Sequence, residues 1–245
     1  MALDKPAGLL TAPDVESPDR PSLMGLLHKG IAEAKPWARD RGLSYLMFPQ
    51  PFAAAQDGVL LLAKSKTVLS ALADLFGSEQ PIVSFVTLVR GSPAEDCFSI
   101  DAKLAPHPAR PDLVVVDPRK GKRARSNFEV VERFDGWTLV KGVPLTWRRN
   151  QLRAHLAHAR LPLAGDDLYR GKPLWLSSLK PNYHLKPNHT ERPLIGAPCL
   201  HAGQLNLTHP ITGQALRIQS PWPRDLLVAL KYLRKYASTT KSSPA

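Results

Sequence analysis

Arginine and histidine side chains gather between positions 146 and 169, in a pattern that suits phosphate binding. Five basic or imidazole side chains fall within eleven residues, and apolar residues recur among them at helical spacing. This pattern predicts a short packed helix that follows a loop and stops at a Leu-Pro-Leu-Ala-Gly turn. Arginines fixed beside a helix start suit phosphate oxygens, although a solvated basic helix face fits the spacing equally well. The basic set is Arg148, Arg149, Arg153, His155 and His158, and the apolar set is Leu152, Leu156 and Ala159.

A second cluster of cations and the overall charge favour a polyanionic partner. Residues 119–125 place five cations in seven positions. The 245-residue chain has 33 Lys and Arg against 21 Asp and Glu, which gives a net charge of +12 and a pI of about 9.9. Such an excess favours RNA or DNA over a membrane as the partner. A charge that only keeps the protein in solution would give the same totals.

The cysteines and the hydropathy exclude several other classes. Cys97 and Cys199 stand alone and far apart, so the sequence predicts neither a metal site nor a disulfide framework. Apolar stretches stay well short of the roughly 18 residues that a membrane helix needs, and the N-terminus lacks the layout of a signal peptide. We therefore expect a reduced, cytoplasmic protein without a metal site, and we also expect a monomer.

The hydrophobic pattern predicts the α+β class with a mainly antiparallel sheet, because many short strands accompany few helices. Helices are expected over residues 23–34, 67–76 and 223–236, the last with Leu226, Leu227, Leu230 and Leu233 facing inward. Strands are expected over 59–63, 83–89, 113–116, 128–133 and 137–140, and a hairpin joins 205–208 to 215–219. Residues 106–125 are expected to form a basic loop, 173–198 a long surface insertion, and 237–245 a disordered tail.

Four stretches carry a family resemblance, in this order: Asp4-Lys-Pro-Ala-Gly-Leu-Leu10, Gly58-Val-Leu-Leu-Leu-Ala-Lys64, residues 146–169, and Leu200-His-Ala-Gly-Gln-Leu-Asn-Leu-Thr-His-Pro-Ile-Thr-Gly213. They resemble the motif blocks of the RluA-like pseudouridine synthases, over about residues 3–230. The resemblance implies the pseudouridine synthase catalytic-domain fold, a mixed, mainly antiparallel bent sheet with flanking helices. It implies a single domain over residues 1–236, without a separate N-terminal RNA-binding module.

The resemblance also implies a chemistry whose central residue is missing here. In that family an aspartate attacks a flipped uridine of rRNA or tRNA and isomerises it to pseudouridine without a cofactor. Its position falls on Ala53, and alanine has neither a lone pair nor a charge. Asp57 stands four positions too late, and reacting groups must meet within about 3 Å. Phe85 stands at the family's tyrosine, where it keeps the ring and loses the hydroxyl; a core strand aromatic fits that position equally.

Arg153 matches the arginine that pairs with the family's aspartate, so it should lack that counter-charge here. An unpaired buried guanidinium is unfavourable. Arg153 should therefore be solvated, paired elsewhere (for example with Asp57), or used on phosphate. Asp166 and Tyr169 match the family as well. By this resemblance and the charge pattern, the predicted RNA-binding residues are Lys5, Lys122, Arg123, Arg148, Arg149, Gln151, Arg153 and His155.

Three hypotheses follow. The favoured one is an RNA-binding, catalytically deficient family member, a pseudoenzyme, because the residues that bind RNA are retained and the catalytic loop is not. The second is an active pseudouridine synthase, an isomerase, that uses a displaced carboxylate: Asp57, Asp166 or Asp167. The third is a decayed relative without specific RNA affinity, whose positive charge only keeps it in solution.

Overall fold

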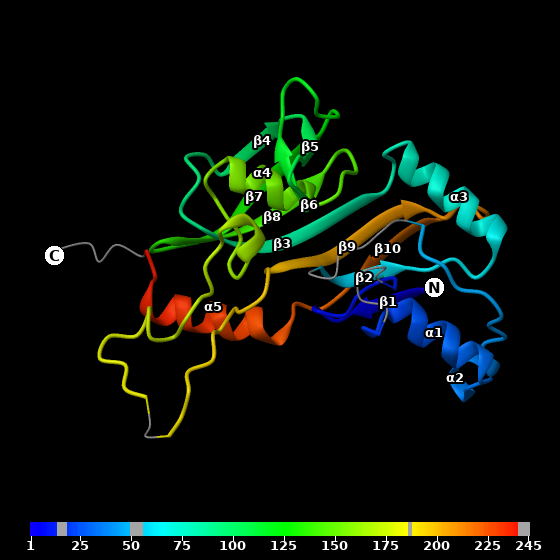
Figure 1. Ribbon diagram of the computed structural model, residues 1–245, viewed down its shortest axis with the longest axis horizontal. Helices are drawn as coiled ribbons and strands as arrows, with labels where there is room; N and C mark the ends of the chain where they lie inside the picture. Colours follow the sequence, from blue (N-terminus) through cyan, green and yellow to red (C-terminus); the bar gives the residue numbers. More distant parts are fainter. Residues whose placement is uncertain (14–18, 50–55, 186–187, 240–245) are drawn as a thin grey trace. The chain divides into compact units, whose positions relative to one another are not determined.

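The computed structural model describes residues 1–13, 19–49, 56–185 and 188–239, which divide into two compact units. Unit 1 comprises Met1–Ser84 and Ala202–Pro221, and unit 2 comprises Phe85–His201 and Trp222–Ala245. The chain passes between the units within strand β3 (Ile82–Arg90), within strand β9 (Leu200–Thr208) and again after Pro221. Sheets with flanking helices confirm the α+β class (Figure 1). The single domain over residues 1–236 stays a prediction.

Unit 1 is built on paired antiparallel strands. Strand β1 pairs with β2, β10 pairs with β9, and β2 neighbours β9. The four residues of β1 were not expected as a strand, because so short a run carries no periodic signal. Apart from β9, the elements of this unit are β1 (Ala2–Lys5), β2 (Asp57–Leu61), β10 (Ala215–Gln219), α1 (Leu23–Ala32), α2 (Pro36–Arg39) and α3 (Lys66–Gly77).

Serine caps begin the two longer helices of unit 1. The Ser22 hydroxyl accepts a hydrogen bond from Gly25 N at 3.2 Å, and the Ser65 hydroxyl accepts one from Val68 N at 3.3 Å. Each cap satisfies a backbone donor that the first helical turn leaves open, which typically stabilises a helix by about 1 kcal/mol. Helix α3 ends at Gly77, as the sequence predicts.

Unit 2 contains a four-stranded antiparallel sheet in the order β3-β8-β7-β4, and a separate β5-β6 hairpin. The hairpin corrects the expectation of a basic loop over 106–125, where several prolines and charges obscure the alternation. The elements of this unit are β4 (Cys97–Asp101), β5 (Leu104–His107), β6 (Arg110–Val116), β7 (Arg125–Phe134), β8 (Trp137–Pro144), α4 (Gln151–His158), the 3-10 turn η1 (Asp167–Tyr169) and α5 (Arg224–Tyr236).

Helices α4 and α5 cover opposite faces of the unit 2 sheet (Figure 1). Leu88 and Leu139 are cross-strand partners and belong to the core cluster that contains the α5 leucines. Gly142 pairs with Phe128 on the other face, where a side chain on Gly142 would also contact Leu152 of α4. The sheet therefore has two buried faces, and each fully buried leucine contributes about 1.5–3 kcal/mol to folding.

One α5 assignment from the sequence is wrong. Leu226, Leu230 and Leu233 are buried as predicted, but Leu227 is 51% exposed. Ala229 takes the remaining inward position, because the apolar stripe follows the i, i+3, i+4, i+7 spacing from 226. Beyond α5, the Ala237 carbonyl accepts a hydrogen bond from Asp135 N at 2.8 Å. Residues 240–245 of the predicted tail lie outside the described residues.

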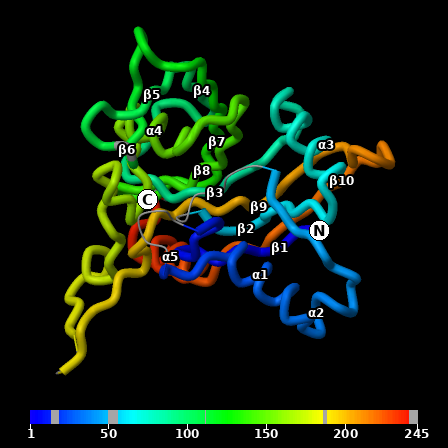
Figure 2. The backbone as a smooth tube through the Cα atoms, turned by 45° about the vertical axis from the view of Figure 1, so that its right-hand side comes forward, coloured from blue at the N-terminus to red at the C-terminus, as the bar shows by residue number. Residues whose placement is uncertain are grey.

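Residues 173–198 make a long excursion from unit 2 (Figure 2), as expected, but its root is part of the core. Leu174 is 0% exposed and Ile195 is 2% exposed, and the two are joined by an antiparallel bridge. Within the described residues, helices are all too short or too polar to cross a membrane.

Candidate functional site

Arg153 forms a buried, two-pronged ion pair with Asp166. The Arg153 Nε donates to Asp166 Oδ2 at 2.7 Å and Nη2 donates to Oδ1 at 2.5 Å. The Asp166 side chain is 0% exposed and that of Arg153 is 7% exposed. Arg153 Nη1 donates to Asn150 Oδ1 at 3.1 Å, and its guanidinium lies 5.0 Å from the centre of the Tyr169 ring. Of the three alternatives left open by the sequence, pairing elsewhere is the one observed, and the partner is Asp166.

A tight turn places Asp166 beside α4. Gly165 has φ +73°, and a Cβ there would lie 2.3 Å from the Ala197 carbonyl oxygen, so only glycine fits. The Asp166 carbonyl accepts hydrogen bonds from the backbone N–H groups of Tyr169 and Gly171. The carboxylate is thus presented by a backbone whose conformation is fixed on both sides.

Tyr169 ties this turn to the β5-β6 hairpin. Its hydroxyl donates to the Val114 carbonyl at 3.0 Å and accepts from Val114 N at 3.2 Å. Burial raises the pKa of Tyr169, so the hydroxyl stays protonated and the ring remains a neutral surface for the Arg153 guanidinium. Asn150 extends the same tie, because its side-chain amide donates to the Asp112 carbonyl at 3.2 Å.

Gln151 and His155, both predicted to bind RNA, lie inside the protein. Gln151 accepts from the Thr146 hydroxyl at 2.8 Å and donates to the Arg125 carbonyl at 2.8 Å and to the Ser126 hydroxyl at 3.0 Å. His155 is 0% exposed and contacts the Ser126 hydroxyl through Nδ1 and the Ala102 carbonyl through Nε2, each at 3.0 Å. These two side chains fasten α4 to the sheet.

The hydrogen bonds fit the neutral form of His155, which its lowered pKa favours. The Ala102 carbonyl can only accept, so Nε2 carries the proton and Nδ1 accepts from the Ser126 hydroxyl. Burial lowers the pKa of His155, and the hydrogen bond to Ala102 opposes this only in part. The ring is therefore a neutral structural group at pH 7.

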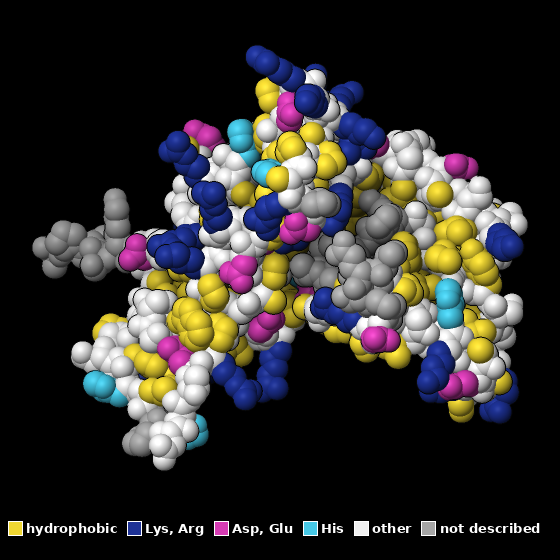
Figure 3. Space-filling model, in the orientation of Figure 1, with side chains coloured by type: hydrophobic (Ala, Val, Ile, Leu, Met, Phe, Trp, Pro, Cys, Tyr) yellow, Lys and Arg dark blue, Asp and Glu magenta, His cyan; other side chains and the backbone are white. Residues whose placement is uncertain are grey.

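Two basic segments that are distant in sequence meet on the surface of unit 2. The Arg148 Nε donates to the Arg123 carbonyl at 3.1 Å, and Arg125 N donates to the Thr146 hydroxyl at 3.0 Å. Thr146 is buried, but six Lys and Arg residues of the two segments are exposed. Figure 3 shows Lys and Arg side chains gathered over the part of unit 2 that carries β5 and β6. We call these residues the basic patch: Arg119, Lys120, Lys122, Arg123, Arg148 and Arg149.

The turn that carries half of the basic patch is held in place. Asp117 Oδ1 accepts from the backbone N–H groups of Arg119 at 2.8 Å and Lys120 at 2.9 Å. Those two hydrogen bonds, that of Lys120 foremost, lower the pKa of Asp117. Leu104 and Lys122 exchange backbone hydrogen bonds at 2.9 and 2.8 Å. Because the backbone is already ordered, little conformational entropy would be lost if an anion bound here.

Lys5, also predicted to bind RNA, is buried in unit 1. Lys5 is 1% exposed, and its Nζ donates to the Gln56 carbonyl at 2.8 Å and to the Pro6 carbonyl at 3.1 Å. Burial lowers the pKa of Lys5 to about 8, and the charge of Asp57 opposes this shift. Lys5 therefore holds the chain where it enters β2.

Of the two positions at which the sequence departs from the family's catalytic motifs, Phe85 and Ala53, the structure describes Phe85. Phe85 is 2% exposed and pairs with Gly142 across β3 and β8, so it lies in the core. Ala53 lies outside the described residues. Among the described residues, no group of three or more His, Cys, Asp or Glu side chains could hold a metal ion.

The roles of several site residues were not predicted from the sequence. Asp166 matched a motif, but nothing marked it as the partner of Arg153. Asp117 had a usable signal, since Asp-Pro-Arg-Lys-Gly is typical of a turn in which the aspartate accepts backbone hydrogen bonds. Thr146 and Ser126 had none, because buried hydroxyl partners depend on how distant segments meet.

The whole-chain comparisons agree with this fold and these motifs. Residues 1–158 match the RNA pseudouridylate synthase family, which is more than half of the chain. The chain belongs to this family, and its relatives place it among the RluA-like members.

Two relatives show the degree of similarity. The chain is 32% identical over 182 residues to ribosomal large subunit pseudouridine synthase C of Yersinia pestis, covering 74% of this chain and 53% of the relative. It is 33% identical over 190 residues to ribosomal large subunit pseudouridine synthase D of Nitrosomonas europaea, covering 76% and 51%. The chain thus spans about half the length of these curated relatives.

A solved structure shares the fold. The human RNA pseudouridylate synthase domain containing 4 superposes with a TM-score of 0.71 at 18% identity, over 95% of this chain and 89% of that chain. At this identity the likeness concerns the fold alone.

Proposed function

We propose that this protein binds structured RNA, rRNA or tRNA, through the basic patch and does not isomerise uridine. The observation that carries the proposal is the hydrogen bond from Arg148 Nε to the Arg123 carbonyl at 3.1 Å, which joins two cationic segments into one exposed surface. Exposed arginines and lysines on an ordered backbone are suited to contact the phosphate oxygens of RNA.

The loss of catalysis rests on three positions. Ala53 supplies no carboxylate at the family's aspartate position, and Phe85 supplies no hydroxyl at its tyrosine position. Arg153 is already neutralised by two hydrogen bonds to Asp166. If Arg153 were buried without a counter-charge, a second carboxylate would be expected beside it. Asp166 already supplies this negative charge.

The alternative of an active synthase would use Asp57 or the exposed Asp167, and an observation favours Asp57. Asp166 is held by Arg153 and fully buried, which leaves it a poor nucleophile. Asp57 lies at the start of β2, close enough to Lys5 for its charge to affect the pKa of the lysine. This arrangement is the observation that favours the alternative.

The two candidate functions separate in one assay. Purified protein is incubated with rRNA and tRNA from cells that lack the gene, and pseudouridine is measured by mass-sensitive detection. We expect no new pseudouridine. Turnover that disappears in Asp57→Ala but persists in Asp96→Ala, an exposed carboxylate elsewhere, would establish the alternative.

Binding is tested by its dependence on salt. The affinity for a structured RNA is measured by anisotropy from low to physiological salt, for the parent and for Arg148→Ala and Arg123→Ala. Each lost phosphate contact should reduce the slope of log affinity against log salt by about one unit. Lys235→Ala on α5 is the control and should leave the slope unchanged. Equal, shallow slopes for all four proteins would favour the decayed relative instead.

A further inference from the structure

Asp117 places a negative charge directly beside the cations of the basic patch. It follows β6 and stands two residues before Arg119 and three before Lys120, both of which are exposed. A carboxylate beside cations lowers the positive potential that attracts a polyanion. Coulomb attraction alone therefore predicts that the chain would bind RNA more tightly without Asp117.

The hydrogen bonds of Asp117 give it a different role. Its Oδ1 accepts from Arg119 N at 2.8 Å and from Lys120 N at 2.9 Å. Its backbone N–H donates to the Lys103 carbonyl, and its carbonyl accepts from Gly121 N, each at 2.9 Å. Backbone and side chain of this one residue thus close the turn of residues 117–121.

Gly121 shows how closely this turn is packed. A Cβ at Gly121 would lie 2.4 Å from the Asp117 carbonyl oxygen and 2.7 Å from the Lys103 carbonyl carbon. Both are backbone atoms, so a larger residue could be accommodated only if the turn moved.

The turn leads directly into the junction of the two cationic segments. Lys122 exchanges backbone hydrogen bonds with Leu104, and the next residue, Arg123, accepts the hydrogen bond from Arg148 Nε. A change in the turn would therefore shift the cations of residues 119–123 relative to Arg148.

We propose that Asp117 is a positioning residue for RNA: its carboxylate fixes Arg119 and Lys120 in the arrangement that binds phosphate, and this outweighs the repulsion of its own charge. The inference rests on the proposed function, RNA binding through the basic patch. An ordered turn presents its cations at fixed places, whereas a mobile turn loses backbone entropy when it binds.

Two variants of Asp117 separate the hydrogen bonds from the charge. Asp117→Ala and Asp117→Asn both remove the negative charge, but asparagine keeps an oxygen that can accept from the two N–H groups. Gly121→Ala disturbs the same turn and changes no charge. Its control is Gly77→Ala, because a Cβ at Gly77 would meet nothing within 4 Å.

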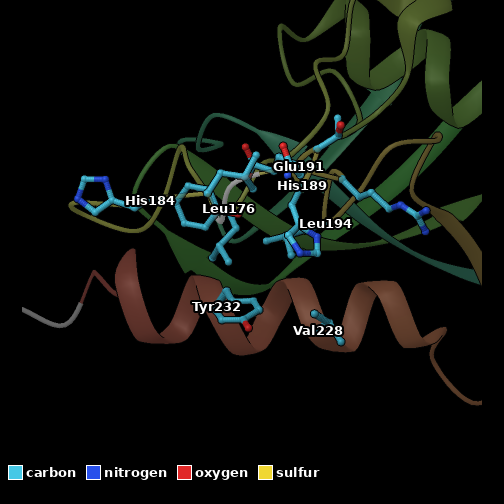
Figure 4. Close-up of a pocket in the computed structure, with 12 residues that line it drawn as sticks. Leu176, His184, His189, Glu191, Leu194, Val228 and Tyr232 are labelled. Atoms are coloured by element: carbon cyan, nitrogen blue, oxygen red, sulfur yellow. The ribbon is translucent and has the colours of Figure 1, made fainter.

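Glu191→Ala is the matched control for Asp117→Ala. The Glu191 carboxylate also accepts from a backbone N–H, that of Ser177 at 2.8 Å. Glu191 lines a pocket between α5 and the excursion of residues 173–198 (Figure 4), and the described lining residues include none of the basic patch. This variant therefore removes the same charge and the same kind of hydrogen bond elsewhere in unit 2.

Anisotropy measures the affinity for a structured RNA at physiological salt, and hydrogen exchange measures the protection of the Arg119 and Lys120 amides. We expect Asp117→Ala to weaken binding about five- to tenfold and to lose the protection of both amides. Gly121→Ala should weaken binding as well. Asp117→Asn should bind at least as tightly as the parent, and Glu191→Ala and Gly77→Ala should bind like the parent.

Equal affinity of Asp117→Ala and Asp117→Asn overturns the inference, because the two variants differ in the hydrogen bonds and not in charge. Thermal melting verifies that each variant is folded. If Arg148→Ala and Arg123→Ala still weaken binding in that case, the proposed function stands. If the parent itself binds no RNA, both fail.

Discussion

Arg153 and Asp166 form an ion pair whose two members are both removed from water, and this decides the cost of losing one. A buried charge left without its partner is far less favourable than an exposed one, because solvent does not replace the lost interaction. Asn150 and Tyr169 contact the arginine as well, but neither carries a compensating negative charge.

We predict that Asp166→Asn lowers the free energy of unfolding by about 3–5 kcal/mol, measured by urea denaturation. Asp96→Asn is the matched control: its carboxylate also binds an arginine, Arg133, but the Asp96 side chain is 82% exposed, so its loss should cost less than about 1 kcal/mol. The double variant Arg153→Met with Asp166→Leu should be more stable than Asp166→Asn, because it leaves no charge buried. Similar small losses for Asp166→Asn and Asp96→Asn would contradict this account.

His155 predicts a dependence of stability on pH. Burial lowers its pKa in the folded protein, while the unfolded chain has the ordinary value of about 6.5. Below that value the unfolded state binds more protons than the folded state, so stability falls as the pH drops and is fully regained above it. Urea denaturation at pH 7 and pH 5 should show a smaller loss for His155→Gln than for the parent. His158→Gln, on the same helix but exposed, should behave like the parent.

At the scale of elements, the turn of residues 163–171 determines where the Asp166 carboxylate lies. Gly165 and Gly136 provide a matched pair, since both have positive φ, +73° and +71°. A Cβ at Gly165 would lie 2.3 Å from the Ala197 carbonyl oxygen, whereas at Gly136 it would meet nothing within 4 Å.

Gly136→Ala should therefore lose only about 1–2 kcal/mol of stability, the cost of a left-handed backbone for alanine. Gly165→Ala should lose about 3 kcal/mol or more, because the backbone must also move away from Ala197. Urea denaturation of both variants gives the comparison. Equal losses would mean that the turn yields without strain.

The elements that the sequence predicted correctly are those with local signals. Helices α1 and α3 follow serine caps and apolar stripes, and the hairpin of β7 and β8 turns at Asp135-Gly136. Leu227 was wrongly predicted to face inward because the leucines of α5 extend around more of the helix than the face that is buried. Strand β6 was predicted in part, as residues 113–116, whereas β5 and its pairing with β6 were missed because prolines and charges obscure the alternation.

The candidate site divides in the same way. The position and exposure of Arg148, Arg149, Lys122 and Arg123 followed from composition and turn signals. Which carboxylate faces Arg153 did not, because Asp57 was the one partner that the sequence suggested, whereas the structure pairs Arg153 with Asp166. The burial of Lys5, Gln151 and His155 also required the packed structure, since a motif match gives a residue's identity and not its surroundings.

For the molecule as a whole, RNA binding and the family's chemistry make different demands. Binding needs a net positive surface, which the charge of +12 and the basic patch supply. The family's chemistry needs a carboxylate, a counter-charge and a hydroxyl together in one pocket. The sequence resemblance places those three positions at Ala53, Arg153 and Phe85; of these, Arg153 is paired with Asp166 and Phe85 is buried.

Restoring one of these residues should consequently not restore the reaction. We predict that Ala53→Asp forms no pseudouridine in rRNA or tRNA by mass-sensitive detection. The new carboxylate would find Arg153 engaged by Asp166 and Phe85 without a hydroxyl, and Gln50-Pro51 in place of the family's His-Arg. RNA affinity is measured on the same preparation and should stay near that of the parent, which shows that substrate is bound.

Ala53→Asn, of the same size but uncharged, is the control. Pseudouridine formed by Ala53→Asp and not by Ala53→Asn would show that one carboxylate suffices, and that the remainder of the catalytic pocket is intact.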